Sequence, residues 1–263
     1  MAQTGAMDGP VMVERDADAV EIGAVIIGDE LLSGKRRDRH QAHLTEALAE
    51  KGLELAWVRI VGDHAGRLTQ TFRETLVSGA EVFSFGGIGA TPDDRTRACL
   101  AEALGRPLAP HPDFMALLEE RFGADAWPHR VRMAELPESA SLIPNPVNGI
   151  PGFSCERHHC VPGFPVMAEP MARWVLEQRF PDRDAAAGAV EETLRLENVT
   201  ESRLVPILEA MEAAFPDLRI SCLPRMDRNA PQVELGLRGP RARVTEGQAA
   251  LRQHLIAGGF LSH

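Results

Sequence analysis

The stretch EVFSFGGIGATPDD at residues 81–94 joins a short apolar run to a turn rich in glycine. The run Glu81–Phe85 is typical of a buried strand, and the residues that follow the turn predict a helix from about Asp94 to Leu104. A strand that passes through a tight turn into a helix is one half of a parallel α/β unit. The stretch therefore predicts an α/β fold in which this turn lies at the carboxyl end of a strand.

The segments on its amino-terminal side repeat the same order. Val20–Ile27 and Leu53–Val61 predict two strands, and Asp38–Lys51 and Ala65–Ser78 predict the helices between the strands. Strands that alternate with helices at this spacing predict a parallel, doubly wound sheet with right-handed crossovers.

The segments on its carboxyl-terminal side are more mixed. Phe114–Phe122 and Met167–Gln178 predict helices, and residues 152–156 and 158–161 predict two short strands. The cysteines and histidines of CERHHC, residues 155–160, lack the paired Cys spacing of a structural zinc site. We therefore interpret this segment as a β-hairpin.

The chain is expected to fall into three parts. Residues 1–18 predict a disordered leader, residues 19–180 the α/β domain, and residues 189–263 a small α+β domain after the linker FPDRDAAAG. The small domain has the order βαββα, which is typical of a two-layer sandwich. Its elements are expected at Val190–Leu196, Thr200–Ala214, Arg219–Pro224, Gln232–Leu237 and Thr245–Ala257.

The composition excludes several classes of protein. With 263 residues and a net charge of −10, the chain is not expected to bind nucleic acid or an anionic membrane. No apolar run has the length of a membrane span, and the four scattered cysteines do not indicate a disulfide framework. We expect a protein of the reducing cytoplasm that binds a small molecule.

Three polar turns follow the three predicted strands, at residues 28–34, 62–64 and 86–94. Ligands of doubly wound sheets bind beyond the carboxyl ends of the strands. We therefore expect the three turns to form one site.

The glycine-rich turn is the main candidate for contact with a ligand. Gly86, Gly87 and Gly89 allow backbone conformations that bring N–H groups close to an anion such as a phosphate. The spacing is neither that of a Walker A loop nor that of a dinucleotide fingerprint. The alternative is a tight strand-to-helix turn without a ligand.

The polar residues of the same turn have more than one interpretation. Thr91 would cap the helix or donate a hydrogen bond to a phosphate. Asp93 and Asp94 would hold a divalent cation, activate a nucleophile or cap the helix.

The first two turns contribute further candidates. Asp29 and Glu30 are two carboxylates that follow a buried strand, which suits contacts with a metal or a hydroxyl group, although an ordinary solvated turn is the alternative. Asp63 is a single carboxylate at the end of the second strand. The candidates of the first turn are Gly28, Asp29, Glu30, Ser33 and Gly34.

Taken in order, these motifs resemble the molybdopterin-binding (MoaB/Mog-like) superfamily, and in particular the N-terminal region of CinA, the competence/damage-inducible protein A. The resemblance covers roughly residues 20–178. It rests on the segments GDELLSG 28–34, VGD 61–63, GGIGATPDDRT 86–96, AELP 134–137, IPNP 143–146, GIPGF 149–153 and VPGFP 161–165.

This resemblance implies a three-layer α/β/α fold with a mostly parallel sheet that binds molybdopterin, another pterin phosphate or a nucleotide. Relatives adenylylate molybdopterin with Mg-ATP, and the CinA branch is associated with hydrolysis of ADP-ribose-like pyrophosphates. The resemblance implies that Asp63 and Asp94 are the two catalytic acids, and that they also bind a divalent cation such as Mg or Co. It places phosphate contacts in the glycine-rich turn and the Asp29-Glu30 segment in the same pocket, and it implies a homo-oligomer.

The chain departs from the family pattern at four site positions, which are His40, Ile88, Ala90 and Met167. The amidase domain of full CinA is also not expected within this chain. Two hypotheses follow: a metal-dependent nucleotide pyrophosphatase, or a non-catalytic module that binds a pterin or a nucleotide. A purely structural interaction protein would leave the grouping of the polar turns unexplained.

Overall fold

The computed structural model describes residues 20–184, 188–226 and 231–261. Within them the chain separates into two compact units. One unit is formed by the residues up to Leu48 together with Glu54–Pro181, and the other by Ala49–Leu53 with the residues from Asp182 onward. The leader predicted at residues 1–18 lies outside the described residues, as do residues 185–187 of the predicted linker.

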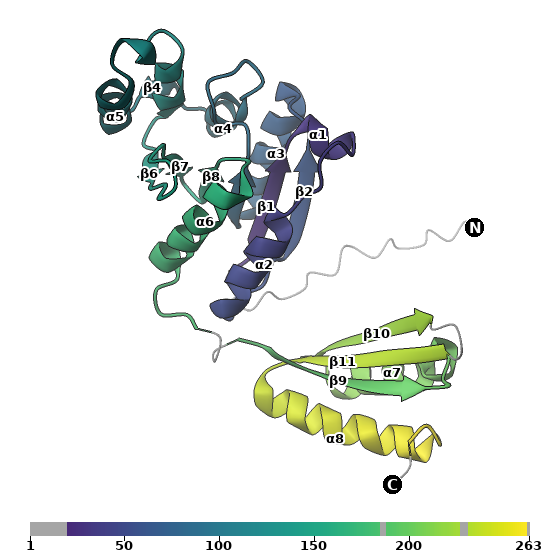
Figure 1. Cartoon of the computed structure of the whole chain (residues 1–263). Coiled ribbons are helices and arrows are strands. Elements are labelled where there is room, and N and C mark those ends of the chain that lie inside the picture. Colours follow the sequence, from purple (N-terminus) through teal and green to yellow (C-terminus); the bar gives the residue numbers. More distant parts are fainter. Residues whose placement is uncertain (1–19, 185–187, 227–230, 262–263) are drawn as a thin grey trace, which may run out of the picture. The chain divides into compact units, whose positions relative to one another are not determined.

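A six-stranded sheet with the order β2-β1-β3-β8-β7-β6 forms the centre of the larger unit (Figure 1). Strands β1, β2, β3 and β8 are parallel, and β7 and β6 complete the sheet in antiparallel pairs. The predicted mostly parallel sheet is therefore confirmed. The bounds are β1 Ile22–Ile27, β2 Trp57–Val61, β3 Glu81–Phe85, β6 Ser141–Ile143, β7 Gly152–Cys155 and β8 His158–Val161.

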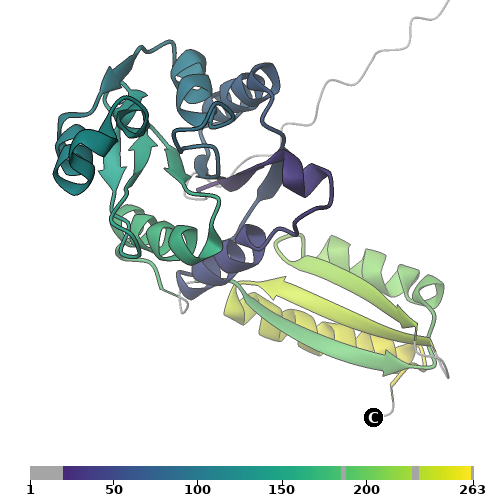
Figure 2. The same ribbon diagram turned by 45° about the horizontal axis from the view of Figure 1, so that its top comes forward.

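Helices cover both faces of this sheet, as the three-layer prediction requires. Figure 2 shows α2 and α6 on one face and α3 and α4 on the other. Successive residues of a strand point to opposite faces, so Val25 and Ile27 of β1 pack with Leu68 and Phe72 of α3 in one buried cluster. The helices are α1 Asp29–Leu32, α2 His40–Glu50, α3 Ala65–Ser78, α4 Thr96–Leu104, α5 Pro112–Phe122 and α6 Pro165–Arg179.

An insertion between α4 and β6 carries a separate two-stranded sheet. It pairs β4, Leu108–Pro110, with β5, Glu135–Pro137, and contains α5 and two 3₁₀ helices, Gly123–Ala126 and Arg130–Ala134. Sequence patterns predicted α5 alone in this region.

The smaller unit has the predicted βαββα order. A three-stranded antiparallel sheet, β10-β11-β9, packs its buried face against α7 and α8, and Leu235, Met211 and Leu251 lie in the shared core. The predicted helix 200–214 is divided into a 3₁₀ turn, Glu201–Arg203, and α7. The bounds are β9 Val190–Glu197, α7 Val205–Ala214, β10 Arg219–Met226, β11 Pro231–Gly239 and α8 Arg241–Ala257.

None of the helices in the described segments is both long enough and apolar enough to cross a membrane.

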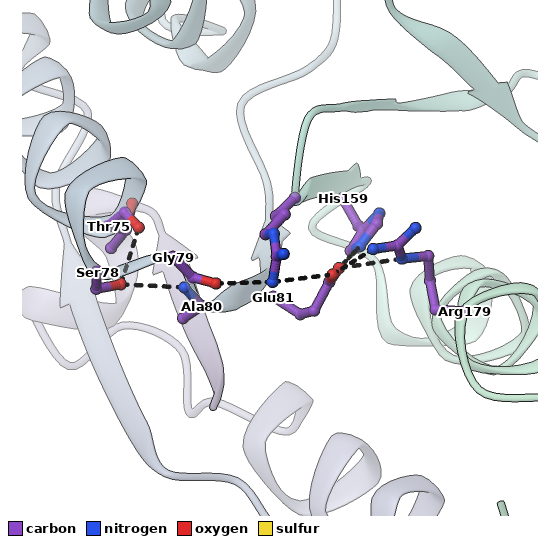
Figure 3. A network of polar contacts seen from close by, with 8 residues as sticks. Thr75, Ser78, Gly79, Ala80, Glu81, His159 and Arg179 are labelled. Carbon is purple, nitrogen blue, oxygen red and sulfur yellow. Dashed lines mark hydrogen bonds and ion pairs between the residues drawn. The ribbon is translucent and has the colours of Figure 1, made fainter. Parts of the chain in front are cut away.

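A buried group of charges ties the amino ends of β3 and β8 together (Figure 3). The Glu81 carboxylate accepts hydrogen bonds from His159 Nε2 at 2.8 Å and from Arg179 Nε at 3.2 Å, and the Arg157 guanidinium lies 3.9 Å away. Glu81 and His159 are each 2% exposed. Burial alone would raise the pKa of Glu81, but the hydrogen bonds from His159 and Arg179 outweigh it and lower the pKa to about 2.

We predict that Glu81→Gln lowers the free energy of unfolding at neutral pH by about 2 kcal/mol, because a buried charge-assisted interaction is lost. The pKa of Glu81 is depressed in the folded state, so its contribution is present above the unfolded pKa near 4.5 and is lost as the pH falls towards 2. Urea unfolding from pH 7 to pH 2.5 measures both effects.

The matched control is Glu46→Gln, at an exposed carboxylate on α2. It should change stability by less than about 0.5 kcal/mol at every pH. An E81Q variant that unfolds like E46Q would show that the ionised Glu81 contributes nothing to stability.

Candidate functional site

All six strands of the main sheet bring a loop to the same edge. The parallel strands β1, β2, β3 and β8 end there, β7 begins there, and β6 ends there. The loops surround a cavity of about 540 Å³. The three polar turns predicted to form one site all contribute to its lining.

The glycine-rich turn is fixed at its start by hydrogen bonds from both sides. The Gly86 N–H donates to the Val161 carbonyl of β8 at 2.9 Å, and the Thr96 hydroxyl donates to the Gly86 carbonyl at 2.8 Å. The Thr96 N–H donates to the Gly87 carbonyl at 3.0 Å. Gly87 has a φ of +68°, and a Cβ atom there would lie 2.4 Å from the Thr96 Oγ1. Glycine is therefore required for conformation and for space.

Beyond this point lie four successive backbone N–H groups with no acceptor among the residues that the structure describes. Within the described residues, the N–H groups of 87–90 donate to no protein atom, and all four residues line the cavity. A run of N–H groups at the surface of a cavity is an arrangement that binds anions.

Thr91 and Asp94 interact with each other. Both the N–H and the hydroxyl of Thr91 donate to the Asp94 Oδ2, the former at 2.9 Å. The helix predicted from about Asp94 begins at Thr96, and its N-cap residue, Arg95, makes no side-chain cap. Of the two roles considered for Thr91, that of helix cap is therefore not observed. The carboxylate of Asp94 instead closes a turn before the helix, which commits the Thr91 hydroxyl and leaves Asp94 Oδ1 free for other contacts.

The buried guanidinium of Arg97 stabilises the glycine-rich turn through hydrogen bonds to backbone carbonyls. Its Nη2 donates to the Gly89 carbonyl at 2.7 Å, and its Nη1 donates to the carbonyls of Arg132 and Glu135. Burial lowers the pKa of Arg97 from its ordinary value, against the attraction of Asp94 and Glu135. Arg97 thus connects the glycine-rich turn to the insertion. No sequence pattern had singled it out.

The first and second turns are joined by a reciprocal pair of hydrogen bonds. The Asp29 N–H donates to the Asp63 carboxylate at 3.0 Å, and the Asp63 N–H donates to the Asp29 carboxylate at 3.2 Å. A Cβ atom at the intervening Gly62 would lie 2.2 Å from Asp29 Oδ1. This close approach requires glycine and positions Asp63 at the cavity.

Carboxylates dominate the charged lining of the cavity. Glu30, Asp63, Asp93 and Asp94 face it with Arg36 as the basic side chain. Burial raises the pKa of the Asp63 carboxyl, as do the nearby carboxylates of Asp29, Glu30 and Asp93, and the hydrogen bond from the Asp29 N–H offsets part of this effect.

These carboxylates are not arranged as a complete metal cage. Among the described residues no group of three or more His, Cys, Asp or Glu side chains is placed to hold a metal ion. Mg²⁺, however, is commonly held by one or two carboxylates together with phosphate oxygens and waters. Asp63 and Asp94 are two carboxylates of this kind that line the same cavity as the N–H groups of residues 87–90.

The opposite part of the lining is apolar. Phe114 of α5, Met133 of the insertion, Ile150, Phe164 and Met167 form it. Phe164 is 56% exposed, so an aromatic face lies open beside the cavity. The cavity therefore offers N–H groups and carboxylates on one side and a hydrophobic surface on the other.

The structure brings together most of the residues proposed from sequence. Asp29 acts through Asp63 and does not line the cavity, and Ser33 and Gly34 lie outside it. Ser33 bonds within its own turn, to the Glu30 carbonyl at 3.3 Å. The proposed residues that line the cavity are Gly28, Glu30, Asp63, Gly86, Gly87, Gly89, Thr91, Asp93 and Asp94.

Several lining residues had no role in the sequence prediction. Asn145 and Asn148 come from the loop after β6, where the Asn145 amide nitrogen donates to the Asn148 side chain at 2.8 Å and to the Ile150 carbonyl at 3.0 Å. Gly163 and Phe164 come from the loop after β8. The motifs IPNP and VPGFP were visible in the sequence, but β8 had no predicted place in the sheet.

Of the four residues that depart from the family pattern, three line the main cavity and one does not. Ile88, Ala90 and Met167 line the cavity, whereas His40 does not. The His40 ring is buried, stacks on Phe85 with centroids 4.6 Å apart, and contacts the Gly163 carbonyl through Nε2 at 3.3 Å.

The chain matches a family model described as "Probable molybdopterin binding domain" over residues 23–182. It is 34% identical over 195 residues to a CinA-like protein from Gloeobacter violaceus, covering 70% of this chain and 45% of that protein. It is 27% identical over 241 residues to a protein from Pyrobaculum calidifontis, covering 87% of this chain and 92% of that protein. The chain thus spans less than half the length of this CinA-like relative.

A solved structure shares the fold of the larger unit. The protein CinA from Thermoplasma acidophilum aligns with a TM-score of 0.57 and 28% identity, covering 62% of this chain and 99% of that chain.

We predict that Gly87→Ala destabilises the protein by at least about 2 kcal/mol, because it combines a strained positive φ with a collision at Thr96. Gly105→Ala is the matched control, since Gly105 has nearly the same φ, +67°, with nothing within 4 Å of an added Cβ. It should cost about 1 kcal/mol. Urea unfolding measures both, and equal losses would contradict the packing of Gly87 against Thr96.

Proposed function

We propose that the cavity binds a phosphate-bearing nucleotide or pterin. The proposal starts from the family, because the chain belongs to the molybdopterin-binding domain family and is related to the N-terminal region of CinA. The phosphate would accept hydrogen bonds from the backbone N–H groups of residues 87–90, and the ring system would lie on the apolar side formed by Phe114, Met133 and Phe164.

The four unpaired N–H groups carry this proposal. Backbone N–H groups in proteins are normally bonded to protein or to water, so a row of four beside a cavity, without an acceptor among the described residues, is available to a ligand. The adjoining apolar surface favours a ligand that also has a flat ring over inorganic phosphate alone.

We expect AMP, ADP-ribose or a pterin phosphate to raise the melting temperature of the full chain. Adenosine, which has the ring without the phosphate, and inorganic phosphate, which lacks the ring, are the matched ligand controls. At 100 times its Kd a ligand adds about 2.7 kcal/mol to the stability of the folded state. Thermal shift and calorimetric titration give the affinities, and no response across nucleotides and pterins would overturn the proposal.

A second candidate function is metal-dependent hydrolysis of the pyrophosphate bond of an ADP-ribose-like nucleotide. It is favoured by the carboxylates that face the same cavity as the free N–H groups, in particular Asp63, whose pKa is raised. Mg²⁺ or Co²⁺, held by Asp63 and Asp94, would supply neutralisation of the charge on the phosphoryl oxygens.

The protein groups would contribute position and charge. The N–H groups of 87–90 would orient the pyrophosphate, with the turn kept rigid by Thr96 and Arg97. The hydrogen bond from the Asp29 N–H would hold Asp63 in one orientation. Only one oxygen of Asp94 is committed to Thr91, which leaves the other to face the ligand.

We expect AMP to be released from ADP-ribose or FAD in the presence of Mg²⁺ or Co²⁺, and Asp63→Asn and Asp94→Asn to reduce this rate by about 100-fold. Burial and the neighbouring carboxylates raise the pKa of Asp63 in the metal-free site, so protons compete with the metal for this carboxylate, and the metal concentration needed for half of the full rate should rise as the pH falls. Chromatographic detection of AMP across a series of pH values and metal concentrations measures both.

The control variant is Asp125→Asn, at an exposed acid of the insertion that does not line the cavity. It should retain the full rate. If wild type binds the nucleotide but releases no more AMP than D94N, the non-catalytic binding module is the correct alternative, and the commitment of Asp94 to Thr91 is then its principal role.

A further inference from the structure

A second cavity, of about 300 Å³, adjoins the first and has a different chemical character. The segment that connects α1 to α2 contributes to its lining through Arg36, Arg37 and Arg39. We refer to it as the arginine cavity.

The arginines of this cavity have no partner within the part of the chain that the structure describes. Arg36, Arg37 and Arg39 are exposed, and none of their guanidinium groups makes a hydrogen bond or ion pair with a described residue. Most other arginines of the larger unit do pair, as Arg59 does with Glu74 at 2.6 Å. Three unpaired guanidinium groups at one cavity, in a chain of net charge −10, are therefore available to an anion from outside.

The acidic residues of the same cavity do not neutralise these arginines fully. Asp38 uses both carboxylate oxygens to cap α2, accepting from the His40 N–H at 2.9 Å and the Gln41 N–H at 3.1 Å. Glu30 lies at the border with the main cavity. His40 also lines the arginine cavity, and burial lowers the pKa of its ring.

The two cavities adjoin and share part of their lining. Ile27, Glu30, Arg36 and Gly163 belong to both linings. A ligand held at the glycine-rich turn would therefore extend past Arg36 towards Arg37 and Arg39.

We propose that the arginine cavity binds a second phosphate group of the ligand, so that the substrate class is a nucleotide carrying a phosphomonoester in addition to the phosphate held at the glycine-rich turn. This inference rests on the proposed function of the main cavity. Guanidinium groups bind phosphate dianions through paired, charge-assisted hydrogen bonds, and a phosphomonoester offers the oxygens and the charge that three such groups require.

The test compares ADP-ribose with 2′-phospho-ADP-ribose, which differ by one phosphomonoester. Calorimetric titration of the full chain should show the phosphorylated probe binding at least about tenfold more tightly, with a preference that falls as the salt concentration rises. The double variant R37A/R39A removes two arginines that line only the arginine cavity. It should abolish the preference while leaving the affinity for ADP-ribose within about twofold.

Arg252→Ala, at an exposed arginine on α8, is the control for loss of positive charge and should retain the preference. Equal binding of the two probes by wild type, or a preference that survives in R37A/R39A, would overturn the inference while leaving the proposed function intact.

Binding of neither probe would instead count against the nucleotide proposed for the main cavity. The arginine cavity is then judged with inorganic pyrophosphate. Thermal stabilisation of wild type that is lost in R37A/R39A, but not in R252A, supports it, and stabilisation equal in all three proteins, or none, overturns it.

Discussion

The parallel pairing of β1 with both of its neighbours determines where everything else in the larger unit lies. Because Ile27, Val61 and Phe85 end neighbouring parallel strands, the turns that follow them meet at one edge of the sheet. The pairing also brings Gly86 close to the Ile27 carbonyl and Gly62 close to the Asp29 carboxylate, so a larger residue at either position would collide. The reciprocal hydrogen bonds of Asp29 and Asp63 are possible only because β1 and β2 deliver the two turns side by side.

The charges at this edge form two separate regions in an acidic protein. Carboxylates from the ends of β1 and β2 face the main cavity, and the backbone N–H groups of residues 87–90, together with Arg36, are the groups there that favour an anion. A phosphate in that position gains from the N–H groups but lies near Asp63 and Asp94, so a divalent cation would balance the charge locally. Arg37 and Arg39 line only the adjoining arginine cavity, whose lining includes neither Asp63 nor Asp94. The separation suits a ligand with charge at both ends.

The sequence predicted the elements whose pattern is local and missed those that depend on distant partners. Residues 65–78 and 81–85 were predicted with their observed bounds, because the helix has an apolar residue every fourth position and the strand is bounded by a polar residue and glycine. The hairpin 152–161 was predicted as an extension outside the sheet, but its second strand, β8, pairs with β3 and adds further strands to the sheet. The four residues of β8 contain no local pattern that would identify β3 as their pairing partner. For the same reason the loop of Gly163 and Phe164 was not placed at the site, although the three polar turns were.

The pairing of β3 with β8 links the stability of one end of the sheet to the geometry of the other. At the amino end Glu81 of β3 binds His159 of β8, and both are buried. At the carboxyl end the Gly86 N–H, one residue beyond β3, bonds to Val161 of β8. A shift of β8 by one residue would turn His159 to the opposite face and remove its buried hydrogen bond to Glu81, leaving only the Arg179 and Arg157 contacts to that carboxylate. The hydrogen bond between Glu81 and His159 therefore favours the register that brings Gly163 beside the glycine-rich turn, although it lies at the far end of the strands from the cavity.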